Sequence, residues 1–208
     1  MVIIKNLVSM IMGVMLMVNG MSQSDALVDR VVSIYIVEHG LVDMDTPPPW
    51  MLNDAGRLHE YAVTAAMDSV ALTHVFSSHT LRSRQTVEGV ADAHSLPLIQ
   101  LPQPGSVLDG QIVTDETPRE AAVGPVSEAL LNLKAGDTAL YGGNSENIFA
   151  ILNKLGVPVV EGCTSDSVCV PCIDKTCFTV SDLRALWHVT IREHIPGVLG
   201  YEKTYLDA

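Results

Sequence analysis

Short apolar runs alternate with stretches of helical periodicity along the chain from residue 31 onward. The apolar and β-branched runs predict buried strands at residues 31–37, 73–76, 96–101, 138–141 and 186–191. Helical spacing between these runs predicts helices at about residues 54–67, 81–93, 125–133 and 146–155. Strands that alternate with helices are typical of a parallel sheet covered on both faces. We therefore expect one α/β domain over residues 30–208, with a mostly parallel central sheet and helices on both faces.

Local signals place several element ends. Asn53 or Asp54 can cap the first helix, whose inner face we expect to carry Leu58, Ala62, Ala65 and Ala66. The Ser77-Ser78 pair is expected in the turn after the second strand. Thr117-Pro118-Arg119-Glu120 has the form of a capping box with proline at the first helical position.

The first twenty-odd residues have the pattern of a leader. Lys5 precedes an apolar run at residues 7–18, which is too short to cross a bilayer easily and is followed by small polar residues. We therefore expect a signal peptide over residues 1–22 and export to the periplasm or the cell exterior, with an uncleaved membrane anchor as the alternative. Small residues favour cleavage after Gly20, Ser22 or Ala26 equally.

Composition narrows the range of partners. The chain has 24 acidic and 12 basic residues, a formal net charge of −12, and no run of Lys or Arg. Such a surface repels phosphate backbones, so nucleic acid is excluded as a partner. After cleavage of the leader we expect no stable membrane span. No cofactor or resident metal is expected.

The cysteines, all four of them, lie in one irregular excursion at residues 161–178. In an exported chain this clustering favours structural disulfides, although the spacing selects none of the three possible pairings. A structural zinc site and a redox Cys-x-x-Cys are the alternatives. The cysteines are Cys163, Cys169, Cys172 and Cys177.

Three predicted strands end in polar or glycine-containing turns. These turns are Glu38-His39-Gly40, Ser77-Ser78-His79 and Gly142-Gly143-Asn144-Ser145. Ligands of open α/β sheets bind beyond the carboxyl ends of the strands, so we expect the three turns to face one crevice. Arg82, one turn into the following helix, can reach the same crevice. A histidine beside an arginine suits attack on a phosphoryl group, since imidazole is a nucleophile and guanidinium binds the oxygens.

Four stretches resemble, in order, motifs of the histidine phosphatase superfamily, the phosphoglycerate-mutase-like group, and most of all its small exported bacterial members. Glu38-His39-Gly40 stands where the family has Arg-His-Gly, and residues 52–57 resemble the Leu-Ser/Thr-x-x-Gly helix start. Residues 77–86 resemble the block Ser-Ser-x-x-x-Arg-Ala-x-Gln-Thr nearly residue for residue. Residues 136–145 resemble the strand that ends Gly-His-Ser or Ser-His-Gly, and residues 182–190 resemble the closing strand.

The resemblance implies a phosphomonoester hydrolase in which His39 accepts the phosphoryl group and Arg82 binds its oxygens. Glu38, Asn144, Ser145 and His79 would then contact the substrate. Two of these positions depart from the family, because Glu38 replaces an arginine and Asn144 replaces the second histidine. The pocket thereby loses the positive charge that compensates a phosphate dianion.

We therefore predict impaired phosphatase activity and a small phosphorylated or acidic ligand. The alternative is a catalytically inactive exported binding or regulatory module, or a structural module built on the cysteine segment. The family often supplies a general acid from the middle of the chain. Asp109, Asp115 and Glu116 lie there, although no motif selects one, and all three are also typical of solvated loop carboxylates.

Overall fold

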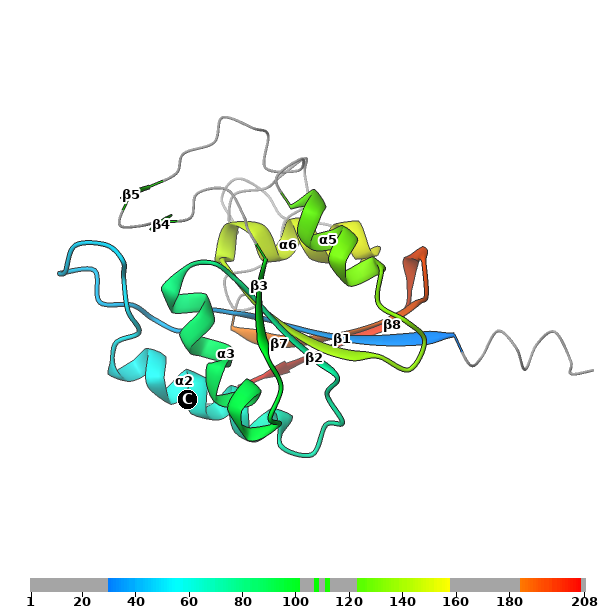
Figure 1. Cartoon of the computed structure of the whole chain (residues 1–208), viewed down its shortest axis with the longest axis horizontal. Coiled ribbons are helices and arrows are strands. Elements are labelled where there is room, and N and C mark those ends of the chain that lie inside the picture. Colours follow the sequence, from blue (N-terminus) through cyan, green and yellow to red (C-terminus); the bar gives the residue numbers. More distant parts are fainter. Residues whose placement is uncertain (1–29, 102–106, 109–110, 113–122, 158–183, 207–208) are drawn as a thin grey trace, which may run out of the picture.

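The computed structural model describes residues 30–101, 107–108, 111–112, 123–157 and 184–206 (Figure 1). The side chains of residues 107, 108, 111, 112, 145, 146 and 196 are not part of this description. The predicted leader, the capping box at residues 117–120, the cysteine excursion and the three candidate acids lie outside it. The predictions for those segments therefore remain predictions.

A six-stranded sheet forms the centre of the fold, with the strand order β3-β2-β6-β1-β7-β8. The strands β3, β2, β6 and β1 run parallel to one another, whereas β7 runs antiparallel to β1 and β8 runs antiparallel to β7. The α/β fold with a mostly parallel sheet is confirmed. The sheet strands are β1 Val31–Glu38, β2 His74–Ser78, β3 Leu98–Leu101, β6 Thr138–Gly143, β7 Ala185–Arg192 and β8 Ile195–Tyr205.

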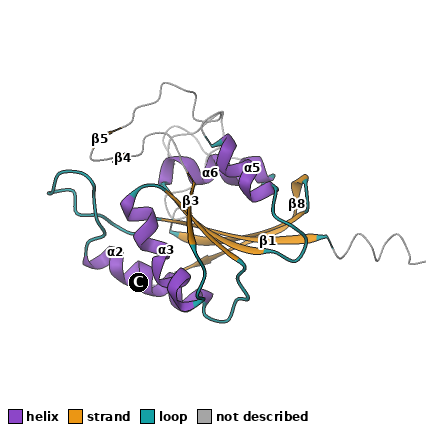
Figure 2. Cartoon of the chain, viewed as in Figure 1, coloured by secondary structure: helices purple, strands orange, loops and turns teal. Residues whose placement is uncertain are grey.

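Helices cover both faces of this sheet, as Figures 1 and 2 show. The helices α2 (Asp54–Met67) and α3 (Leu81–Ala93) lie on one face, and α5 (Gly124–Leu131) and α6 (Ser145–Leu155) lie on the other. The described residues also include a two-stranded ribbon of β4 (Val107–Leu108) and β5 (Gln111–Ile112).

The sheet separates two apolar cores, and alternation along β1 serves both. Ile34 and Ile36 pack into the core beneath α5 and α6, while Val37 packs into the core beneath α2 and α3. Successive residues of a strand point to opposite faces, so a strand buried on both faces must be apolar almost throughout. This explains why the run at residues 31–37 predicts β1 correctly.

The end of the sheet differs from the prediction. Residues 186–191 were expected to form the last strand, but β8 follows β7 through a tight turn in which His194 has φ +58°. The sequence of β8 does not predict a strand, because it contains residues that are typical of turns, namely Pro196, Gly197 and Gly200. An edge strand tolerates them because one side of its backbone needs no partner in the sheet.

Two local expectations are wrong. Ser77 and Ser78 are the last residues of β2, fully buried, and do not form a turn. On α2, Leu58 is 56% exposed and Ala65 is exposed, whereas Gly56, Val63 and Met67 are buried on the inner face. Ala66 packs against the core, as predicted. The cap itself is as expected, because the Asn53 side chain accepts a hydrogen bond from the Gly56 backbone N–H.

Within the part of the chain that the structure describes, no helix has the length and apolar character needed to cross a bilayer.

Candidate active site

The three polar turns meet at one edge of the sheet. The strands β1, β6 and β2 are neighbours and parallel, so their carboxyl ends lie side by side (Figure 1). Glu38 pairs with Gly143 across β1 and β6, and the His39 backbone N–H donates to the Gly143 carbonyl at 3.0 Å. The structure thus brings together the strand ends that carry His39, Asn144 and His79, as the sequence predicts.

His39 is held in one orientation by its own backbone. Its Nδ1 lies 2.8 Å from the Gly40 carbonyl oxygen, which can only accept, so Nδ1 carries the proton. The other ring nitrogen, Nε2, is then unprotonated and has a free lone pair. The pKa of His39 is lowered to about 4, chiefly by burial and also by the charges of Arg82 and His59, while the hydrogen bond to the Gly40 carbonyl acts in the opposite direction. At neutral pH the ring is therefore an uncharged nucleophile.

The loop that carries His39 packs backbone to backbone against the start of α2. A Cβ atom at Gly40 would lie 2.6 Å from the Gly56 carbonyl oxygen, and one at Gly56 would collide with the Leu41 carbonyl oxygen. The Gly40 N–H also donates to Thr86 Oγ1 on α3 at 3.0 Å. Two glycines and a hydroxyl therefore set the position of this loop.

Arg82 lies in the first turn of α3 and is only 9% exposed. Its charge acts on His39, as the lowered pKa of that ring shows. Its guanidinium carbon lies 5.7 Å from the centre of the Trp50 ring, a cation–π distance. The Trp50 indole N–H donates to the Thr46 carbonyl at 3.1 Å, which anchors the proline loop. Trp50 is a site residue that the sequence analysis missed.

Asn144 lies at the end of β6 and is 2% exposed. Its Oδ1 accepts hydrogen bonds from three hydroxyls: Ser83 Oγ at 2.7 Å, Thr80 Oγ1 at 2.9 Å and Ser78 Oγ at 3.2 Å. These residues belong to the end of β2 and the start of α3. The amide therefore ties β6 to the segment that carries Arg82, a role that the sequence did not suggest.

A cavity of about 320 Å³ opens on the α2 side of His39. His59 lies in its wall, and its Nε2 is 3.2 Å from the Glu38 carbonyl oxygen. Burial lowers the pKa of His59, the carbonyl opposes this, and the Arg184 charge lowers the pKa further. Arg184, just before β7, had no motif to reveal it.

The remaining candidates are less defined. His79 follows β2, is half-buried, and has its pKa lowered by burial. Ser145 begins α6, but its side chain is outside the described set. Among the described residues, no three His, Cys, Asp or Glu side chains are grouped closely enough to hold a metal ion.

Comparison with known proteins gives a consistent result. The profile of the histidine phosphatase superfamily (branch 1) matches residues 34–103, which include His39 and Arg82. Residues 34–103 therefore carry the sequence pattern of the histidine phosphatase superfamily. A comparison with curated protein sequences finds no match.

Solved structures of low identity share the histidine phosphatase fold. The protein histidine phosphatase SixA, complexed with tungstate, is 19% identical over 83% of this chain and 94% of its own, with a TM-score of 0.51. A mycobacterial glucosyl-3-phosphoglycerate phosphatase is 10% identical over 86% and 100%, with a TM-score of 0.54. Mycobacterial hydrolase 2 is 11% identical over 85% and 91%, with a TM-score of 0.56.

We expect Asn144→Ala to destabilise the domain by about 1–3 kcal/mol, because three buried hydroxyls lose their common acceptor. Urea denaturation measures the free energy of unfolding. Asn153→Ala is the matched control, since Asn153 is exposed on the same helix, α6. Equal stability of the two variants would contradict the role of the hydroxyl cluster.

The pKa of His39 also predicts a pH dependence of stability. Because the folded-state pKa of about 4 lies below the unfolded value of 6.5, the unfolded chain binds more protons between these pH values. Stability is therefore full above pH 6.5 and falls as the pH drops toward 4. We expect the wild type to lose about 3 kcal/mol more than His39→Asn between neutral pH and pH 4. If urea denaturation shows the same loss in the free energy of unfolding for the wild type and for His39→Asn, the lowered pKa of His39 is contradicted.

Proposed function

We propose that the chain hydrolyses phosphomonoesters through a phosphohistidine on His39, with a rate limited by two replaced pocket residues. The observation that carries the proposal is the contact between His39 Nδ1 and the Gly40 carbonyl, which leaves Nε2 unprotonated. Arg82 supplies the positive charge nearby. Among proteins of similar structure, SixA is a phosphatase complexed with tungstate, and the mycobacterial phosphatase has been complexed with inorganic phosphate.

The reaction has two displacements. In the first, the Nε2 lone pair attacks phosphorus, an N–P bond forms, and the P–O bond to the alcohol breaks. The leaving oxygen takes up a proton and departs as the alcohol. In the second, water attacks phosphorus, the N–P bond breaks, and its electron pair returns to Nε2 as inorganic phosphate leaves. The Gly40 carbonyl keeps the proton on Nδ1 throughout and stabilises the charge that develops on the ring.

Charge explains why we propose a slow reaction. Glu38, directly before His39 and half-buried, places a negative charge where family members have a positive one. In a partly buried site, a positive charge close to the phosphate stabilises binding by on the order of several kcal/mol, and a negative charge at the same distance destabilises it by a similar amount. The side-chain oxygen of Asn144 accepts hydrogen bonds from three hydroxyls, and the side chain is uncharged. Compensation of a phosphate dianion falls largely to Arg82.

One observation favours the second candidate, a catalytically inactive binding module. The three hydroxyls around Asn144 form a buried neutral network at the corner where the family has its second histidine. A site in which this network replaces a catalytic group can still bind an anion through Arg82. Such a module would bind phosphorylated ligands without turning them over.

A single assay separates the two candidates. Purified protein is incubated with generic phosphomonoesters from acid to neutral pH, and released inorganic phosphate is measured. Turnover that depends on His39 supports the phosphatase. Binding of phosphate without turnover at any pH supports the module.

A further inference from the structure

The cavity on the α2 side of His39 is larger than a phosphoryl group alone requires. Its volume of about 320 Å³ is in the range of sites that bind small organic molecules. Three segments far apart in the chain build it: the end of β1 with the loop after it, the first two turns of α2, and the segment around β7 and β8. Its lining residues are Glu38, His39, Gly40, Leu41, Val42, Ala55, Leu58, His59, Arg184 and Leu206.

Much of this wall is aliphatic. Leu41, Val42, Leu58 and Leu206 contribute apolar side chains, and Leu41 and Leu58 are 54% and 56% exposed. Apolar surface left in water is costly by about 25 cal/mol per Å², so a ligand that covers it gains that free energy. Exposed leucines around a concave site therefore favour a ligand with an apolar body.

The cavity lining contains one arginine, Arg184. Arg184 is exposed and forms no ion pair with any residue that the structure describes. Its charge nevertheless acts on His59, which lines the same cavity. Glu38 lines the cavity as well, but in a chain of net charge −12, with twice as many acidic as basic residues, the arginine in this wall offers a binding partner for an anionic group of a ligand.

We propose that this cavity binds the organic part of the phosphorylated substrate, an apolar chain or ring that bears an acidic group paired with Arg184. The assignment rests on the proposed phosphatase function, because it takes His39 as the residue that meets the phosphoryl end. His39 borders both the cavity and the region of Arg82. In this assignment the leucines contact the apolar body, and Arg184 binds the acidic group.

The test uses 3-phenylpropionate, an apolar carboxylate without phosphate, and measures binding to the full chain by calorimetry. We expect saturable binding, weakened at least tenfold in Arg184→Gln through loss of the charge. Leu58→Asp should weaken binding to a similar extent, because it places a carboxylate in the apolar wall. Both positions are exposed, so neither change threatens folding.

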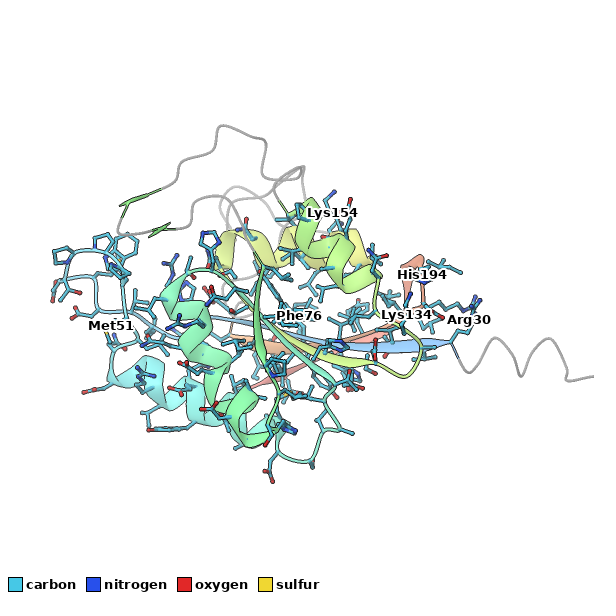
Figure 3. All side chains as sticks on the ribbon, in the orientation of Figure 1. Arg30, Met51, Phe76, Lys134, Lys154 and His194 are labelled. Carbon is cyan, nitrogen blue, oxygen red and sulfur yellow. The ribbon has the colours of Figure 1, made fainter. Side chains whose placement is uncertain are left out.

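Matched controls lie outside the cavity. Arg30→Gln removes an equal charge at the amino end of β1, opposite the end that carries His39, and Figure 3 shows Arg30 there with Lys134 and His194. Tyr61→Asp adds a carboxylate on α2 at a residue that is 66% exposed. Both should bind the probe as the wild type does. Absence of saturable binding, or equal affinity of wild type and Arg184→Gln, overturns the proposal.

The probe keeps this result separate from the phosphatase activity. Since 3-phenylpropionate has no phosphoryl group, a chain without turnover still reports whether the cavity binds it. Loss of turnover with binding retained counts against the proposed function alone, whereas turnover without binding counts against the cavity assignment alone.

Discussion

Replacement of His39 by alanine is expected to abolish phosphomonoester turnover, a loss of about 1000-fold or more. In the proposed reaction Nε2 of His39 is the nucleophile, which stays unprotonated because the Gly40 carbonyl holds the proton on Nδ1, and alanine has nothing to form the N–P bond. The measurement is inorganic phosphate released from an aryl phosphate. The wild type should also carry an acid-labile phosphoryl group on the peptide that contains His39 when it is quenched during turnover.

His74→Ala is the matched control for this change. His74 is half-buried like His39, but it begins β2 and so lies at the opposite edge of the sheet. It should retain full turnover. Turnover by His39→Ala equal to that of the wild type would rule out the phosphohistidine route.

Glu38→Arg is expected to raise kcat/KM for phosphomonoesters by about 100-fold. The change turns a negative charge beside the nucleophile into a positive one that can bind phosphoryl oxygens as the charge on them develops. Glu38 is half-buried at the end of β1, so the new charge is only partly screened by water. Steady-state kinetics at low ionic strength, with the same aryl phosphate, measures the gain.

Global charge needs its own control in this experiment. Glu128→Arg makes the same change in net charge at an exposed position on α5. It should leave kcat/KM within about twofold of the wild type, since exposed charges beyond roughly 10 Å are screened. No gain from Glu38→Arg would show that the missing arginine is not what limits catalysis. A gain in both variants would point to steering of the substrate by net charge.

The substitution Asn144→His, which would restore the second histidine of the family motif, is a less informative experiment. Asn144 is 2% exposed and holds three hydroxyls through one oxygen. A larger ring would have to fit into a filled space and would break those contacts. For this reason Glu38 is the better place to restore family chemistry.

Most of the fold could be predicted because burial leaves a periodic signal. The bounds of α3 were predicted without error, and β1 was predicted to within one residue, since nearly every residue of β1 faces one of two cores. The strand β8 was missed because Pro196 and Gly197 belong to an edge whose sheet contacts are one-sided. The inner face of α2 was misassigned because its closest contact is Gly56, where the loop requires a residue without a side chain.

The site was predictable only where residues follow each other in a motif. His39 and Arg82 lie in short blocks of fixed spacing, so their meeting could be inferred. Arg184 comes close to His59 only because β7 pairs antiparallel with β1, so that its first residues lie beside the end of β1. No local pattern encodes that contact, and the same holds for Trp50 over Arg82.

The paired glycines under the catalytic loop have an evolutionary consequence. Gly40 and Gly56 fix the path of the backbone by direct contact, and the neutral hydroxyl of Thr86 supports it. Charges in the pocket can therefore change one codon at a time while the nucleophile keeps its place. A search for distant relatives of this chain should therefore give the two glycines more weight than the arginine and the second histidine, whose positions hold Glu38 and Asn144 here.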